Sequence, residues 1–114
     1  VKTLKNKLQK KSEAICNALD KYFGSSAEYK KPDGGIFVWV DMHKKVDTSR
    51  LYELALKDGV AINPGNEWSI NKSGRHKMRL CFGNPSIKEI DEGIKRLAII
   101  CRKEFGIPTK IANL

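Results

Sequence analysis

Residues 77–82 alternate between apolar and polar side chains and place an arginine near the middle. Met78, Leu80 and Phe82 fall on one face of the predicted strand. If that face packs on the interior, Arg79 projects from the opposite side of the sheet. A guanidinium there can bind a carboxylate through two parallel hydrogen bonds, a geometry that lysine does not reproduce. The structural alternative, which the pattern alone favours, is an ordinary ion pair with Asp or Glu on a neighbouring strand.

Other constellations for catalysis or metal binding are not evident. No glycine-rich phosphate loop opens a helix, and no Ser–His–Asp arrangement can be assembled. His43 and His76 lie far apart and lack the spacing of metal ligands. Cys16, Cys81 and Cys101 form no CxxC pair and sit in apolar stretches, where a free thiol behaves as a small hydrophobic group. We therefore predict structural, reduced cysteines in a cytoplasmic protein.

A turn signal precedes the most apolar strand of the chain. Residues 32–35 combine proline and aspartate with Gly34 and Gly35, which allow backbone conformations closed to other residues. Residues 36–40 follow with apolar, β-branched and aromatic side chains on both faces. This pattern predicts an interior strand that is covered on both sides, with Trp39 in the core.

Segments of helical periodicity flank these strands. Apolar residues recur at helical spacing over about residues 2–23, and Gly24 is suited to a left-handed C-cap. Asp47 precedes a second helix over about residues 49–57, which Gly59 ends.

The last helix has the clearest boundaries. Ser86 and Glu89 form a capping-box pattern, in which each side chain satisfies a free backbone N–H, and Gly106 ends the helix. Its predicted buried stripe consists of Ile87, Ile90, Ile94, Leu97, Ala98, Cys101 and Phe105.

The remaining segments complete the order helix, strands, helix, strands, helix. Short strands are expected near residues 27–30 and 60–62, a turn at 63–65 and a loop over 66–76. An open, mostly antiparallel sheet with helices on one face satisfies these patterns, so we predict a two-layer α+β fold. The length fits a single domain over residues 1–114.

The net charge of +9 raises the question of nucleic-acid binding. Residues 1–31 contain eight lysines and three acidic residues, and the rest of the excess is spread along the chain. Few aromatic residues interleave with the lysines, so no base-stacking platform is evident. The pattern favours a solvated, lysine-rich surface over a nucleic-acid site.

Several short motifs together resemble the C-terminal segment of class I/II, fold-type I aminotransferases, which depend on pyridoxal 5'-phosphate (PLP). The resemblance covers nearly the whole chain, and the order and spacing of the motifs carry it. It is greatest for the branch with 2-aminoadipate and aromatic aminotransferases and the aminotransferase-like domains of MocR-type transcriptional regulators. The motifs are Pro32-x-Gly34-Gly35-x-Phe37-x-Trp39, the helix end at Gly59-Val60, Pro64-Gly65, Arg79-Leu80-x-Phe82 and Glu92-Gly93-Ile94-x-x-Leu97.

The resemblance implies a role for particular residues. In this family the arginine of the R-L-x-F strand binds the substrate α-carboxylate, which here is Arg79. The turn at Gly34 and Gly35 is expected near the substrate entrance. Because the Schiff-base lysine and the other PLP-binding residues belong to the family's large domain, we expect no catalysis and no PLP binding by this chain alone. The start at Val1 suggests a fragment of a longer chain.

The implied parent protein is a cytoplasmic homodimer that transfers an amino group from an amino acid to a 2-oxo acid. Within it this domain packs against the large PLP domain. The alternative is the effector domain of a MocR-type regulator, which a winged-helix segment upstream would indicate. A free-standing nucleic-acid-binding module is the least favoured interpretation. The sequence shows no signal peptide and no apolar run of membrane-spanning length.

Overall fold

The computed structural model describes residues 2–30, 37–65, 75–83, 85–107 and 109, with side chains from Leu8 onward. Its helices are α1 (Lys2–Tyr22), α2 (Thr48–Lys57) and α3 (Ile87–Phe105), and a short 3-10 turn follows α1. In this part of the chain, no helix is both long and apolar enough to span a membrane.

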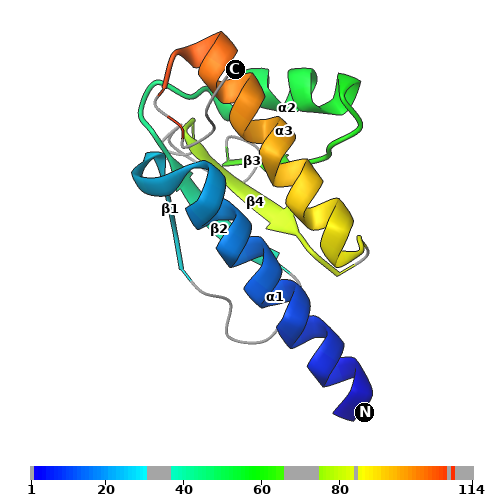
Figure 1. The fold of residues 1–114 in the computed structure, drawn as a ribbon. Coiled ribbons are helices and arrows are strands. Elements are labelled where there is room, and N and C mark those ends of the chain that lie inside the picture. The colour runs from blue at the N-terminus through cyan, green and yellow to red at the C-terminus, as the bar shows by residue number, and fades with distance from the viewer. Residues whose placement is uncertain (1, 31–36, 66–74, 84, 108, 110–114) are drawn as a thin grey trace.

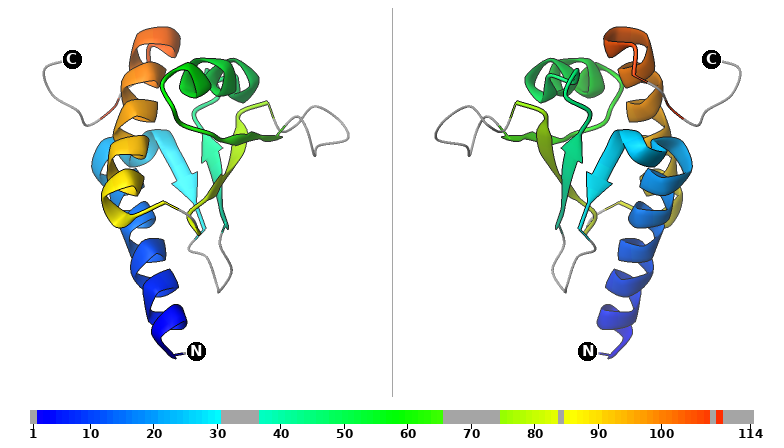
Figure 2. Two further views of the ribbon diagram at one scale, coloured as in Figure 1. Left: turned by 90° about the vertical axis from the view of Figure 1, so that its right-hand side faces the viewer. Right: turned by 90° about the vertical axis from the view of Figure 1, so that its left-hand side faces the viewer.

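Four strands form one antiparallel sheet in the order β1-β2-β4-β3. They are β1 (Ala27–Tyr29), β2 (Phe37–Met42), β3 (Asn63–Pro64) and β4 (Lys77–Cys81). Helices α1 and α3 run side by side over one face of this sheet (Figures 1 and 2). The predicted two-layer α+β architecture is therefore confirmed.

The core lies between the sheet and the two long helices. Alternate residues of β2 and β4 enter it and meet the apolar stripes of α1 and α3, so the predicted periodicities of strand and helix converge on one interior. Its fully buried side chains include Leu19, Phe23, Val38, Met78, Phe82 and Leu97.

The cap residues of α3 act as predicted. The Ser86 hydroxyl accepts a hydrogen bond from the Glu89 backbone N–H at 3.1 Å, and the Glu89 carboxylate accepts one from the Ser86 N–H at 3.0 Å. At the other end Gly106 has φ +67°, a left-handed conformation that glycine adopts without strain.

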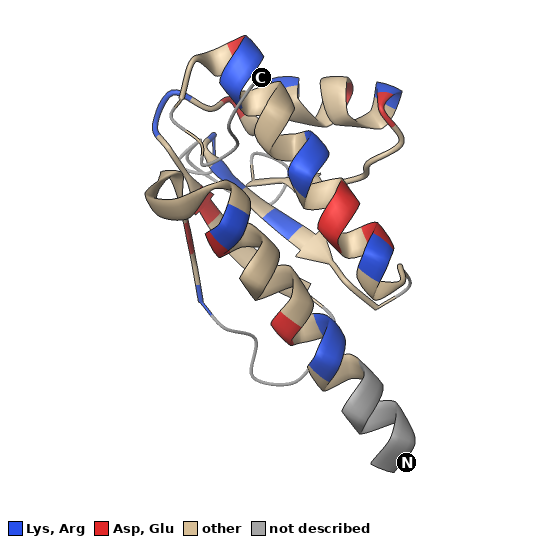
Figure 3. Ribbon diagram, viewed as in Figure 1, with Lys and Arg blue, Asp and Glu red and all other residues tan. Residues whose placement is uncertain are grey.

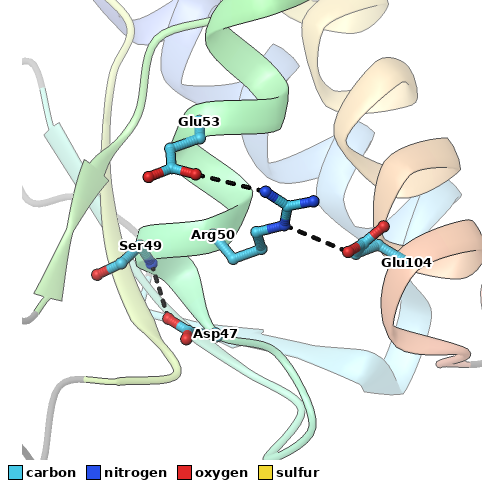
Figure 4. Close-up of polar contacts among 5 residues, drawn as sticks. All are labelled: Asp47, Ser49, Arg50, Glu53 and Glu104. Carbon is cyan, nitrogen blue, oxygen red and sulfur yellow. Dashed lines mark hydrogen bonds and ion pairs between the residues drawn. The ribbon is translucent and has the colours of Figure 1, made fainter.

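Helix α2 contacts α3 and the edge strand β3. Asp47 caps its first turn by accepting a hydrogen bond from the Ser49 N–H at 3.1 Å. Arg50 reaches Glu53 in the same helix at 3.4 Å and Glu104 of α3 at 3.3 Å (Figure 4). These exposed ion pairs add little stability, so the burial of Leu51 and Ala55 is the main attachment of α2.

The prediction that β2 is covered on both faces is wrong. Val38, Val40 and Met42 are buried by the helices, but Trp39 on the opposite face is 50% exposed and is not a core residue. β2 is interior only in the plane of the sheet, where β1 and β4 flank it.

The third strand was predicted too early in the chain. Residues 60–62 do not form it, because the Val60 N–H donates to the Ala55 carbonyl at the end of α2. Asn63 and Pro64, which were predicted to begin a turn, pair with β4 instead. A proline is tolerated there because β3 is an edge strand.

The buried stripe of α3 was predicted one residue too long at its start. Ile87 is 48% exposed, whereas Ile90, Ile94 and Leu97 are buried. Ile87 lies in the first turn of α3 and lines a surface groove with polar residues of α1, including Asn17.

Candidate carboxylate-binding site

Arg79 occupies the middle of β4 and has a paired strand on each side. It lies opposite Trp39 of β2 and opposite Asn63 of β3. Its neighbours Met78 and Leu80 are buried in the core, so the strand alternation directs Arg79 to the face away from the helices. We call this surface the outer face of the sheet. The predicted orientation of Arg79 is thus confirmed.

Two aromatic rings of β2 contact the Arg79 guanidinium. Its Cζ lies 4.2 Å from the centroid of the Phe37 ring and 5.5 Å from that of Trp39. Trp39 is the direct cross-strand partner of Arg79, and Phe37 is the diagonal one, two residues along β2. Both distances are within the range of a favourable cation–π interaction.

The polar surroundings of Arg79 are incomplete. Its Nε atom is buried and has no hydrogen-bond partner among the described residues. Asp41, the nearest acid along the outer face of β2, pairs with His76 at 3.3 Å instead. Within the described ranges Arg79 forms no ion pair, so the expected pairing with a neighbouring acid is wrong for this part of the chain. A buried, unsatisfied donor is costly unless a ligand supplies the acceptor.

The outer face carries further polar groups on both sides of Arg79. Lys77 lies opposite Asp41, and Cys81 lies opposite Phe37. Next to Trp39, an open groove of about 430 Å³ is lined in part by Glu28, Asp41 and Lys77. Arg79 is therefore at the centre of a surface with both aromatic and charged groups.

The three cysteines are free, but they occupy two different environments. Cys16 and Cys101 are buried, and burial raises the pKa of the Cys101 thiol to about 12. Cys81 is exposed on the outer face, where the alternation of residues 77–82 places it together with Arg79, so only Cys16 and Cys101 are buried as small hydrophobic groups.

Gly34 and Gly35 lie outside the described residues. His43 and His76 do not combine with other side chains in a metal site, since no group of three or more His, Cys, Asp or Glu in the described part of the chain could hold an ion. Basic and acidic residues both occur along α3 and along the part of α1 whose side chains are described (Figure 3).

Sequence reasoning missed the role of Phe37 and Trp39 beside Arg79. Their alternation within β2 placed them on one face, but only the pairing register places that face against Arg79. Aromatic residues at alternate positions of one strand, next to a strand with an arginine on the same face, are the signal that could have indicated the contact between the rings and the guanidinium.

The comparisons with known proteins agree with this architecture. The chain belongs to the aminotransferase class I and II family, whose model matches residues 1–97. An uncharacterized aminotransferase from Saccharolobus solfataricus is 37% identical over 98 residues, which cover 86% of this chain and 24% of the relative. The resemblance found in the ordered motifs is therefore confirmed, and the chain spans about a quarter of the length of that relative.

Two further relatives represent the enzyme and the regulator branches. The α-aminoadipate aminotransferase LysN from Thermus thermophilus, solved with N-(5'-phosphopyridoxyl)-L-leucine, matches with a TM-score of 0.77 and 30% identity, covering 86% of this chain and 25% of LysN. The uncharacterized HTH-type transcriptional regulator YisV from Bacillus subtilis is 31% identical over 100 residues, which cover 88% of this chain and 20% of the regulator.

Proposed function

We propose that residues 1–114 are the C-terminal small domain of a PLP-dependent aminotransferase and supply the arginine that binds the substrate α-carboxylate. The reaction is the transfer of an amino group from an amino acid to a 2-oxo acid. The observation that carries this proposal is Arg79, whose guanidinium lies over aromatic rings on the outer face while its buried Nε has no partner among the described residues.

Arg79 suits this role chemically because both substrates carry an α-carboxylate. A guanidinium binds a carboxylate through parallel charge-assisted hydrogen bonds and so fixes both its position and its plane. Holding the carboxylate in one orientation positions the amino or keto carbon for reaction, which lowers the entropic part of the barrier. Gly34 and Gly35 lie shortly before β2 in sequence, with Ile36 between them and the strand, and we assign them to the substrate entrance.

The cofactor belongs to another part of the longer protein in this proposal. Each lysine whose side chain is described is exposed or half-buried. When bound, PLP withdraws electrons from the substrate α-carbon. The contribution of this chain is to bind and orient the carboxylate. We propose that the large domain belongs to the same polypeptide and that the whole enzyme is a cytoplasmic homodimer.

The test is Arg79→Lys in the full-length enzyme. Lysine keeps the charge but loses the bidentate geometry, so kcat/KM for the preferred amino acid is expected to fall by roughly tenfold to a hundredfold. The matched control is Arg75→Lys, since the Arg75 side chain is exposed and lies 3.9 Å from Asp47. Steady-state kinetics give kcat/KM for both variants. A change of less than about threefold for Arg79→Lys would show that the carboxylate assignment is wrong.

The second candidate is the effector domain of a MocR-type transcriptional regulator, which the similarity to YisV favours. If this chain belongs to such a regulator, Arg79 would bind the carboxylate of an effector amino acid. The coding sequence upstream of residue 1 distinguishes the two. A PLP domain without a winged-helix segment ahead of it supports the enzyme, and a winged helix followed by a PLP domain supports the regulator.

A further inference from the structure

We infer that Phe37 and Trp39 are positioning residues, which hold the Arg79 guanidinium in place for the substrate carboxylate. This inference rests on the proposed function and extends it to the residues that contact the arginine. The observation is the arrangement of both rings against one guanidinium, at 4.2 Å and 5.5 Å from Cζ.

The sheet register fixes this arrangement. Trp39 pairs directly with Arg79, and Phe37 pairs with Cys81, two residues further along β4. On the opposite face, Val38 pairs with Leu80, and both are buried in the core. Because a register shift would expose those core residues, the rings and the arginine are held against each other by the packing on the far side of the sheet.

Aromatic contacts are well suited to prepare an arginine for a ligand. A ring face attracts the cation but accepts no conventional hydrogen bond, so the N–H donors remain available. A carboxylate neighbour would occupy those same donors and compete with the substrate. The rings also restrict the side-chain rotamers, which reduces the entropy lost when the carboxylate binds.

The two rings are expected to contribute unequally. Phe37 lies closer to Cζ and is half-buried, whereas Trp39 is farther from it and 50% exposed. Cation–π interactions strengthen as water is excluded. Phe37 is therefore the more important of the two positioning residues.

Kinetics of the full-length enzyme test this role. Phe37→Leu is expected to raise KM for the amino acid and for the 2-oxo acid by the same factor, about fivefold to tenfold, with kcat changed less than about twofold. The two factors agree because both substrates share the carboxylate. Trp39→Leu has a smaller effect in the same direction, while Phe37→Tyr, which keeps the ring, stays within about twofold of the parent protein.

The matched control is Leu56→Ala, since Leu56 is an apolar residue on α2, outside strands β2 and β4, with 53% of its surface exposed. It is expected to leave both KM values unchanged. Unequal KM changes for the two substrates in Phe37→Leu, or no change in either, would overturn the inference.

An NMR measurement on the chain itself gives a readout that does not depend on activity. The Arg79 Nε–H signal, assigned by its loss in Arg79→Lys, is expected upfield of an ordinary arginine because it lies near ring faces. Phe37→Leu moves it downfield and accelerates its exchange with solvent, and Phe37→Tyr restores both. An Nε–H signal that is unaffected by Phe37→Leu and by Trp39→Leu would overturn the inference.

The two proposals fail in distinguishable ways. If Arg79→Lys reduces kcat/KM strongly while Phe37→Leu has no effect, the carboxylate assignment stands and the positioning role is wrong. If Arg79→Lys has no effect on kinetics, the carboxylate assignment fails, and with it the role of the rings in substrate binding.

Discussion

The two faces of the sheet use the same strands for different purposes. The face toward the helices consists of apolar side chains that are almost completely buried, among them Val38, Val40, Met78 and Leu80. The outer face carries aromatic rings, charges and a thiol that remain accessible to solvent. Strand alternation therefore assigns stability to one face and the proposed binding site to the other. This division allows the outer face to vary chemically without loss of the core.

The largest expected difference between the faces is in stability. Leu80→Ala removes a buried side chain and is expected to lower the free energy of unfolding by about 2–5 kcal/mol. Trp39→Ala removes a larger side chain from the outer face, where cross-strand pairs contribute about 0.2–1 kcal/mol. Urea denaturation of both variants measures the contrast. Equal losses would contradict the functional division of the two faces.

The cysteines sharpen the same comparison without any substitution. Cys81 on the outer face is expected to react rapidly with a thiol reagent at about pH 8, because its side chain is exposed to solvent. Cys16 and Cys101 are buried, so their modification requires opening of the structure and should be slower by roughly a hundredfold or more. Time-resolved labelling with mass spectrometry identifies each site. Rapid modification of Cys101 in the folded protein would contradict its position in the core.

The smallest expected effect lies at an exposed side chain in the first turn of α3. The hydrogen bond from the Ser86 backbone N–H lowers the pKa of Glu89 below its ordinary value. The charged carboxylate therefore stabilises the folded state above its ordinary pKa, and this contribution is lost as pH falls through the lowered value. Glu89→Gln should be less stable than the parent near pH 6, with a difference that shrinks toward pH 3, as followed by thermal unfolding.

The same pH dependence provides a control for the comparison of faces. Leu80→Ala and Trp39→Ala leave the capping box intact, so each should keep the stability difference that Glu89→Gln produces. Loss of that difference in Trp39→Ala would show that the outer face is coupled to α3 through the sheet.

The sequence by itself determined the features that depend on neighbouring residues. The alternation of residues 77–82 placed Arg79 on one face of the strand and Met78, Leu80 and Phe82 on the other. The capping-box spacing located the start of α3. These predictions succeeded because strand and helix periodicities are local properties of the backbone. The ordered motifs also identified the family, although no single one of them is specific.

Only the tertiary structure decided which residues meet across the sheet. Trp39 and Arg79 are forty positions apart in sequence, and their contact depends on the register of β2 against β4. Composition made Trp39 resemble a core residue, but burial depends on whether another layer covers that face, and here the helices cover the other one. The displacement of β3 has the same origin, because the end of α2 uses the Val60 N–H before the chain can pair with β4. Periodicity defines which side chains share a face, whereas packing between distant segments determines what that face contacts.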